Sequence, residues 1–245
     1  MSLPVFSSTV ARILRQLRHD HRTLALMVVV PLVFLTLLYF MYDDDPLLFD
    51  RVALIMLGIF PFILMFLVTS IAMLRERTSG TLERLFTTPV AKLDLLFAYG
   101  VAFGLAAAVQ ATVATAAAYL IFGLDTAGGA VWAVVIAVAN ALLGVALGLL
   151  CSAFARTEFQ AVQFMPVVAI PQILLCGLFV ARDAMAGWLQ ALSNVLPLSY
   201  AVEALQEVGA SADPTGLMLR DIGIVVGAVV IALVLAAATL RRRTP

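Results

Sequence analysis

Six long runs without a charged residue dominate this 245-residue sequence. They cover residues 23–41, 52–74, 95–122, 130–154, 159–180 and 222–240. Each run has about 20 residues or more, the length at which an α-helix crosses the hydrocarbon core of a bilayer. Charged residues are only 12% of the chain and hydrophobic residues 63%, whereas about 25% of an average soluble domain is charged. The sequence therefore predicts an all-α integral membrane protein with six transmembrane helices.

A more polar helix is predicted ahead of the first run, in residues 1–22. Its apolar side chains recur at helical spacing on one stripe: Phe6, Val10, Ile13, Leu14 and Leu17. Arg12, Arg15 and Arg18 lie off that stripe. A helix with an apolar stripe and a basic opposite face lies in the membrane interface rather than across the bilayer. We expect an amphipathic interfacial helix that connects to a six-span domain, residues 23–245.

Basic residues predict the orientation of the spans, because Lys and Arg accumulate on the cytoplasmic side. With a cytosolic N-terminus, 12 of the 15 basic residues fall inside: Arg12, Arg15, Arg18, Arg22, Arg75, Arg77, Arg84, Lys92, Arg156, Arg241, Arg242 and Arg243. The outside keeps Arg51, Arg182 and Arg220, together with the acidic residues 43–45. Both termini are therefore expected in the cytosol, and the protein in the cytoplasmic membrane.

Residues 181–221 lie outside in this arrangement and contain two short apolar stripes. The stripes comprise Met185, Trp188, Leu189 and Leu192, then Tyr200, Ala204, Leu205 and Val208. Pro197 lies between them, and neither is long enough to cross a bilayer. We expect two short interfacial or re-entrant helices, with Trp188 and Tyr200 at the level of the lipid headgroups.

The longest charge-rich interruption in the first half of the chain is residues 75–92. Within it, residues 81–87 are predicted to form a short helix, with Gly80 at the N-cap and Glu83 near the positive end. One edge of this helix is apolar and the opposite side is charged: Leu82, Leu85 and Phe86 against Glu83 and Arg84. So short a helix buries too little apolar area to be stable alone, and this predicts a partner.

The sixteen residues 75–90 read Arg-Glu-Arg-Thr-Ser-Gly-Thr-Leu-Glu-Arg-Leu-Phe-Thr-Thr-Pro-Val. This stretch resembles the cytosolic loop of the type-2 ABC-transporter permeases, particularly their daunorubicin-resistance and multidrug-efflux branch. In that family the loop forms a coupling helix that touches the ATPase subunit. The resemblance implies that this contact is made by Glu76, Arg77, Gly80, Thr81, Leu82, Glu83, Arg84, Leu85 and Phe86. It also implies a type V exporter-like fold, in which two permease chains, identical or paralogous, work with two ATPase chains. An ordinary basic loop would explain the arginines, but it would not require Gly-Thr-Leu-Glu in that order.

No nucleotide, metal or catalytic site is predicted in this chain. No P-loop precedes its only lysine, Lys92, so ATP and magnesium are expected on the partner ATPase. Cys151 and Cys176 lie inside apolar runs, where cysteine is usually a small apolar filler. No charged residue lies within the spans as drawn above, whereas proton- and ion-coupled carriers usually place such residues there. Energy for transport is therefore expected from another subunit.

These features predict a permease of an ATP-driven exporter for an amphipathic, drug-like or lipid-like substrate, in contact with membrane lipids and not with nucleic acid. Asn140 and Gln172 are the candidate residues of a substrate path, although each side chain could simply bond a neighbouring helix. The glycine pairs 100/104 and 144/148 permit close helix packing, within one chain or between chains. Two alternatives stay open: a lipid or polysaccharide exporter of the same family, and an ATP-independent channel or membrane assembly protein.

Overall fold

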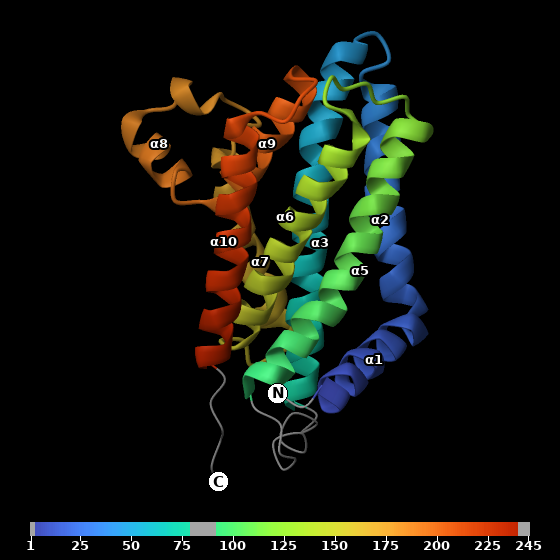
Figure 1. Ribbon diagram of the computed structural model, residues 1–245, viewed down its shortest axis with the longest axis vertical. Coiled ribbons are helices and arrows are strands. Elements are labelled where there is room, and N and C mark those ends of the chain that lie inside the picture. Colours follow the sequence, from blue (N-terminus) through green and yellow to red (C-terminus); the bar gives the residue numbers. More distant parts are fainter. Residues whose placement is uncertain (1–2, 79–91, 240–245) are drawn as a thin grey trace.

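The computed structural model describes residues 3–78 and 92–239 of the chain (Figure 1). These residues form nine α-helices and one short 3-10 helix, and they contain no strand. The elements are α1 (Leu3–His19), α2 (His21–Met41), α3 (Pro46–Thr78), α5 (Lys92–Leu120), α6 (Gly129–Ser152), α7 (Glu158–Leu175), η1 (Arg182–Ala184), α8 (Gly187–Ser193), α9 (Pro197–Ala210) and α10 (Gly216–Thr239). Six of them, α2, α3, α5, α6, α7 and α10, are long and apolar enough to cross a membrane. The predicted all-α, six-span fold is confirmed.

The ends of several spans differ from the prediction, and α7 and α10 are two examples. α7 ends at Leu175, five residues before the predicted 180, and the chain then turns at Gly177, whose φ of 95° favours glycine. α10 begins at Gly216, six residues before the predicted 222. The Thr215 hydroxyl accepts a hydrogen bond of 3.1 Å from the N–H of Met218, so Thr215 caps that helix.

α3 and α6 pack against each other at the centre of the bundle (Figure 1). A Cβ atom at Gly144 would lie 2.2 Å from the Phe62 carbonyl oxygen, and one at Gly148 would lie 2.6 Å from that of Phe66. Only glycine lets the two backbones approach so closely. The 144/148 pair therefore serves a contact within this chain.

The second glycine pair is also used inside the chain. A Cβ atom at Gly104 on α5 would lie 2.8 Å from Leu142 on α6, and one at Gly100 would lie 3.6 Å from Leu233 on α10. Four prolines lie inside continuous spanning helices: Pro31, Pro61, Pro166 and Pro171.

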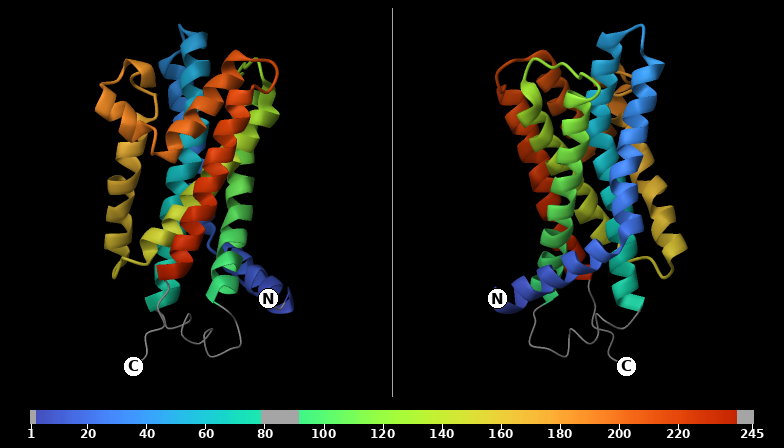
Figure 2. Two further views of the ribbon diagram at one scale, coloured as in Figure 1. Left: turned by 60° about the vertical axis from the view of Figure 1, so that its left-hand side comes forward. Right: turned by 90° about the vertical axis from the view of Figure 1, so that its right-hand side faces the viewer.

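The two ends of the molecule carry different elements (Figures 1 and 2). α1, the end of α3, the start of α5 and the end of α10 lie together at one end, which we call the stem end. α8, α9 and the start of α10 lie at the opposite end, which we call the hairpin end. α1 runs across the bundle at the stem end rather than along it. Both ends of the described chain lie at the stem end, and which side of the membrane this is stays a prediction.

α8 and α9 form a re-entrant hairpin. After α7 the chain rises to the hairpin end, returns through α8 and rises again through α9 (Figure 2). Leu198, Ala201, Val202 and Leu205 of α9 are fully buried. The two short helices predicted here are confirmed, and α9 is packed into the bundle rather than lying on it.

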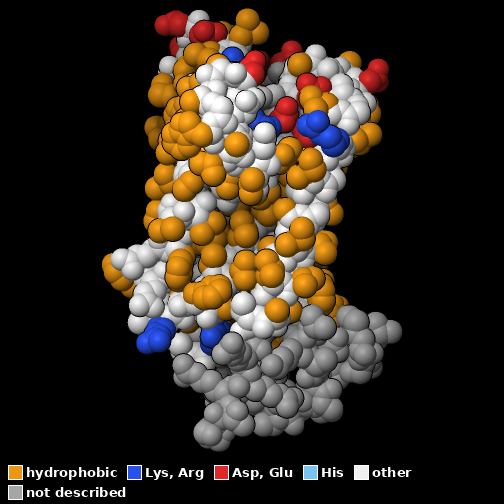
Figure 3. Space-filling model, turned by 90° about the vertical axis from the view of Figure 1, so that its left-hand side faces the viewer, with side chains coloured by type: hydrophobic (Ala, Val, Ile, Leu, Met, Phe, Trp, Pro, Cys, Tyr) orange, Lys and Arg blue, Asp and Glu red, His pale blue; other side chains and the backbone are white. Residues whose placement is uncertain are grey.

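The surface agrees with a membrane environment. On the face shown in Figure 3, hydrophobic side chains cover most of the middle, and acidic side chains gather at the hairpin end. α7 is the least apolar of the six candidate spans, and only three of its residues are buried. The protein is a multi-pass membrane protein with six candidate spans.

Candidate functional site

The last turn of α3 places three charged residues at the stem end: Arg75, Glu76 and Arg77. α3 stays helical to Thr78, so these side chains leave the helix about 100° apart and reach different neighbours. The two arginines suit this position, because the C-terminal end of a helix carries a partial negative charge. The end of α3 is therefore a branching point for polar contacts.

The first contact ties α3 to α1 and α5. Arg12 of α1 donates a 3.2 Å hydrogen bond to Glu76 and a 2.7 Å hydrogen bond to the hydroxyl of Tyr99 on α5. Glu76 is only 6% exposed, and a carboxylate buried to that degree needs a charged partner. Burial lowers the pKa of Arg12, but Tyr99 and Glu76 outweigh it, so the pKa is raised and the guanidinium stays charged. Arg12 lies off the apolar stripe of its helix, yet its side chain is only 35% exposed because it bonds to Glu76 and Tyr99.

The other two arginines tie α3 to α6 and α7. Arg75 donates bonds of 2.8 and 3.2 Å to the two carboxylate oxygens of Glu158, the first residue of α7. Arg77 donates to the backbone carbonyl of Ser152, the last residue of α6. The side chains of Arg75 and Glu158 are 61% and 54% exposed, so this ion pair contributes little to stability. Its geometry still links the end of α3 to the start of α7.

A cavity of about 330 Å³ lies beside this branching point, between α1, α2, α3 and α5. Its walls include the apolar residues Leu26, Leu67 and Phe103, and its lining also includes the polar residues Gln16 and Asp20. A cavity lined by both kinds of residue suits an amphipathic molecule better than a small ion.

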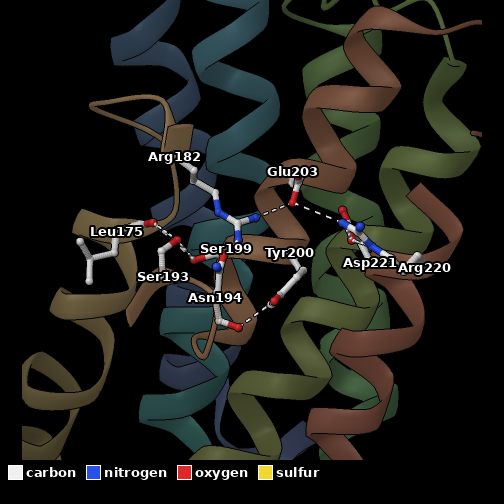
Figure 4. Close-up of polar contacts among 9 residues, drawn as sticks. All are labelled: Leu175, Arg182, Ser193, Asn194, Ser199, Tyr200, Glu203, Arg220 and Asp221. Atoms are coloured by element: carbon white, nitrogen blue, oxygen red, sulfur yellow. Dashed lines mark hydrogen bonds and ion pairs between the residues drawn. The ribbon is translucent and has the colours of Figure 1, made fainter. Parts of the chain in front are cut away.

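A second polar cluster lies at the hairpin end (Figure 4). Arg182 contacts Glu203 of α9 and donates to the side-chain oxygen of Asn194. Its guanidinium also lies 5.0 Å from the centre of the Tyr200 ring, a cation–π arrangement. Glu203 in turn lies 3.8 Å from Arg220 of α10. All five of these residues line a cavity of about 690 Å³.

Asp221 holds Arg220 from inside the bundle. Its carboxylate accepts bonds of 2.9 and 2.7 Å from Arg220 and is fully buried. Every charged residue was predicted to lie outside the spans. This prediction is wrong for Arg220 and Asp221, because α10 begins at Gly216 and includes both residues. Thr215, which caps α10, was the signal in the sequence that would have shown the earlier start.

Comparison with known proteins places this architecture in a family. The model of the ABC-2 type transporter family matches residues 5–208, which is most of the chain. The chain belongs to the ABC-2 type transporter family.

Three curated relatives are similar to this chain at 24–29% identity. The probable multidrug ABC transporter permease YbhR of Escherichia coli (strain K12) is 29% identical over 142 residues, 58% of this chain and 39% of that protein. YbhS, a probable multidrug permease of the same strain, is 24% identical over 165 residues, 66% of this chain and 44% of that protein. ABC transporter G family member 20 of Dictyostelium discoideum is 26% identical over 157 residues, 64% of this chain and 20% of that protein. The matched part of the chain thus spans less than half the length of each relative.

Most of the predicted ATPase contact in this ABC-2 chain lies outside the described residues: Gly80, Thr81, Leu82, Glu83, Arg84, Leu85 and Phe86. The contact stays a prediction for these residues. Glu76 and Arg77 are described, and both bond to other helices of the same chain. The structure thus places them at the base of the predicted coupling loop, where they connect it to the bundle.

The two residues proposed for a substrate path lie between helices. Asn140 of α6 is fully buried and donates a 2.7 Å bond to the Gly58 carbonyl of α3. Gln172 of α7 is buried and accepts a 3.4 Å bond from the N–H of Leu198 at the start of α9. Both side chains join neighbouring helices, the alternative that the sequence left open, and neither lines the two cavities described above. Their role in a substrate path stays a prediction.

Proposed function

We propose that this chain is the permease subunit of an ATP-driven exporter, and that residues 75–92 pass the action of a separate ATPase to the bundle. The observation that supports this most is the branching point at the base of that loop. From the last turn of α3, direct contacts reach α1, α6 and α7, and Arg12 of α1 extends the first of them to Tyr99 of α5. A displacement of this helix end is therefore transmitted to four other helices. Two ATPase chains would bind ATP and magnesium and act at the stem end, on the cytosolic side.

The proposed substrate is amphipathic and enters from the membrane or its inner leaflet. Charged residues of the candidate spans lie near the helix ends, as in α3, α7 and α10, and a charge near the bilayer centre costs about 2.5–3.5 kcal/mol or more. The stem-end cavity is mostly apolar and has polar residues in its lining. The multidrug names of two distant relatives favour a drug-like substrate.

A second permease chain completes the proposed transporter. α7 supports this, because only three of its residues are buried and Gln163 is exposed on this candidate span. A side-chain amide facing lipid would lack hydrogen-bond partners. We place the second chain, identical or paralogous, along α7.

The experiment that tests the proposal changes the predicted coupling loop. Burying Leu82, Leu85 and Phe86 on the ATPase would contribute roughly 1.5–3 kcal/mol each before ordering costs. Glu83→Lys, or Leu82→Asp combined with Phe86→Asp, should therefore reduce co-purification of the ATPase and abolish export. Arg18→Glu is the matched control, because Arg18 is an exposed charge at the same end of the molecule.

Permease expression and membrane insertion should stay at the wild-type level in all of these variants, because no span is altered. The measurements are pull-down of the ATPase and drug-stimulated ATP hydrolysis in reconstituted vesicles. Unchanged pull-down and unchanged hydrolysis in the loop variants would show that residues 75–92 are not the coupling element.

A further inference from the structure

The stem-end cavity lies in the angle between α1 and α2. The two helices meet at Asp20, where the chain turns from its course across the bundle to its course along it (Figure 2). Leu26 lines the cavity and is 59% exposed. It begins an exposed apolar surface of α2 that continues through Val29 and Val33. Because such a surface suits lipid, a molecule dissolved in the membrane can reach the cavity without passing through water.

Polar and apolar lining residues are separated along the cavity. α3 passes from Leu64 at the apolar end to Arg75 and Glu76 at the polar end. Leu64 and Arg75 are about 16 Å apart along the helix axis, roughly the depth of one leaflet of a hydrocarbon core about 30 Å thick. The volume of about 330 Å³ is near the lower end for ligand pockets. The cavity therefore fits one apolar tail with a polar head.

The polar end has an excess of negative charge. Its two acidic lining residues are Asp20 and Glu76. Glu76 is paired with Arg12, whereas Asp20 is in no ion pair within the described part of the chain. Arg75, the one basic lining residue, is bonded through two nitrogens to Glu158. One carboxylate, that of Asp20, is thus left for a cationic group from outside the chain.

Helix ends and the other basic residues agree with this charge. α1 ends at His19 and α3 at Thr78, so two helix C-termini, which carry partial negative charge, lie near the polar end, against one N-terminus from α2. The neighbouring basic side chains Arg15, Arg18 and Arg22 are exposed and do not line the cavity.

We propose that the stem-end cavity binds an amphipathic molecule with one apolar tail and an ammonium head, and that Asp20 selects the head. The tail lies against Leu64, Leu67 and Phe103, and the head lies beside Asp20. An anionic head would be repelled by Asp20, and a neutral head would gain the apolar contacts alone. That this molecule is the exported substrate rests on the proposed function; its binding in the cavity does not.

The test uses three light-activated probes that differ only in the head. They are dodecylamine, dodecanol and dodecyl sulfate, each with a diazirine near the end of its chain. The full-length protein is placed in phosphatidylglycerol nanodiscs, which contain no ammonium head, without its ATPase and without ATP. Mass spectrometry measures labelling of the cavity residues Leu64, Leu67 and Phe103. This is divided by labelling of the exposed α10 residues Val230 and Ile231, which corrects for different partitioning into the membrane.

We expect the corrected labelling by the amine to exceed that by the alcohol about fivefold, which corresponds to about 1 kcal/mol, and the sulfate to label least. Asp20→Asn keeps a capping oxygen and should bring the amine to the level of the alcohol, while labelling by the alcohol itself stays unchanged. Asp20→Ser, a second neutral cap, replaces it if thermal unfolding shows that Asp20→Asn has lost its fold. Asp213→Asn is the matched control, because it removes the same charge from an exposed position at the other end of the molecule. It should leave the ratio within about twofold.

Equal cavity labelling by the amine and the alcohol, or stronger labelling by the sulfate, would overturn the proposal. An amine preference that folded Asp20→Asn and Asp20→Ser proteins retain would overturn it as well, because Asp20 would then not select the head.

A further arm identifies the source of the ammonium head. Half of the phosphatidylglycerol is replaced by phosphatidylethanolamine. A fall in cavity labelling by the amine would assign the cavity to an aminophospholipid of the membrane, and unchanged labelling would assign it to a lipophilic amine; both results support ammonium recognition. Export of dodecylamine by the permease with its ATPase is a separate readout. Its absence, with cavity labelling intact, would count against the proposed function alone.

Discussion

The two ends of the molecule use charged side chains in opposite ways. At the stem end, contacts spread outward from one helix end, through Arg75, Glu76 and Arg77, to α1, α6 and α7. Arg12 of α1 extends them to α5. At the hairpin end, contacts converge, because Arg182 and Arg220 both approach Glu203. A divergent set of contacts distributes a displacement over many helices, whereas a convergent set can be released at one point.

Burial sharpens this contrast. The stem end includes the exposed pair Arg75–Glu158, which water and salt screen strongly. Arg182 is 16% exposed and Asp221 is fully buried, so breaking contacts at the hairpin end leaves charges that water solvates poorly. A single substitution should therefore matter more at the hairpin end than at the exposed part of the stem end.

The largest effect is expected from a change that separates α3 from α6, the central pair of helices between the two ends. In Gly144→Ala the new Cβ would lie 2.2 Å from the Phe62 carbonyl oxygen, so α3 and α6 must move apart at a cost of about 1–3 kcal/mol or more. Gly227→Ala in α10 is the control, because nothing lies within 4 Å of its added Cβ. Detergent unfolding titrations measure both. Equal stability of the two variants would show that α3 and α6 do not depend on this close contact.

A smaller loss is expected when the buried part of the stem end is broken. Glu76→Gln leaves Arg12 without its carboxylate and should cost about 1–2 kcal/mol, less than the 3–5 of a fully buried pair, because the Arg12 side chain is 35% exposed. Arg75→Gln should cost less than about 1 kcal/mol. Limited proteolysis of α1, together with unfolding titrations, measures the difference. If Arg75→Gln lowers stability more than Glu76→Gln does, the exposed ion pair to α7 stabilises the stem end more than the contact with α1.

The sequence predicts the spans well because the physics that selects them is local. An uncharged run of about 20 residues must satisfy its backbone groups internally when it lies in lipid, and a helix does so. The ends of the spans are harder, because they lie among polar residues outside the runs. α3 shows this: it begins at Pro46, where Asp45 accepts a 3.1 Å bond from the N–H of Leu48, six residues before the predicted 52.

The polar clusters could not be predicted because their members are far apart in the chain. Arg12 and Glu76 are 64 residues apart, and the helical periodicity of α1 assigns Arg12 to the solvent side. Arg182, Glu203 and Arg220 come from three separate segments, and the sequence predicts only that these segments lie on the outside. The sequence does contain the glycines that join α3 and α6, but the choice of partner helix depends on the packed bundle.

The smallest expected effect concerns Asp20, which lies between α1 and α2 at the stem end. Its carboxylate accepts a 2.6 Å bond from the Thr23 hydroxyl and a 3.1 Å bond from the Thr23 N–H, and so caps α2. These bonds lower the pKa of Asp20 in the folded protein. The stabilisation is therefore complete above the unfolded-state pKa of about 3.9, and it is lost as the pH falls through the lower folded value.

Asp20→Asn keeps a capping oxygen but does not titrate. The stability advantage of the wild-type protein over Asp20→Asn should be about 0.5 kcal/mol at pH 7 for an exposed charge at a helix start. This advantage should shrink between pH 5 and pH 3. Unfolding titrations across that range measure it, with Asp20→Ala, which loses the cap, as the reference for about 0.5–2 kcal/mol. A wild-type advantage over Asp20→Asn that stays constant as the pH falls would show that the charge of Asp20 does not stabilise the junction that fixes α1 to the bundle.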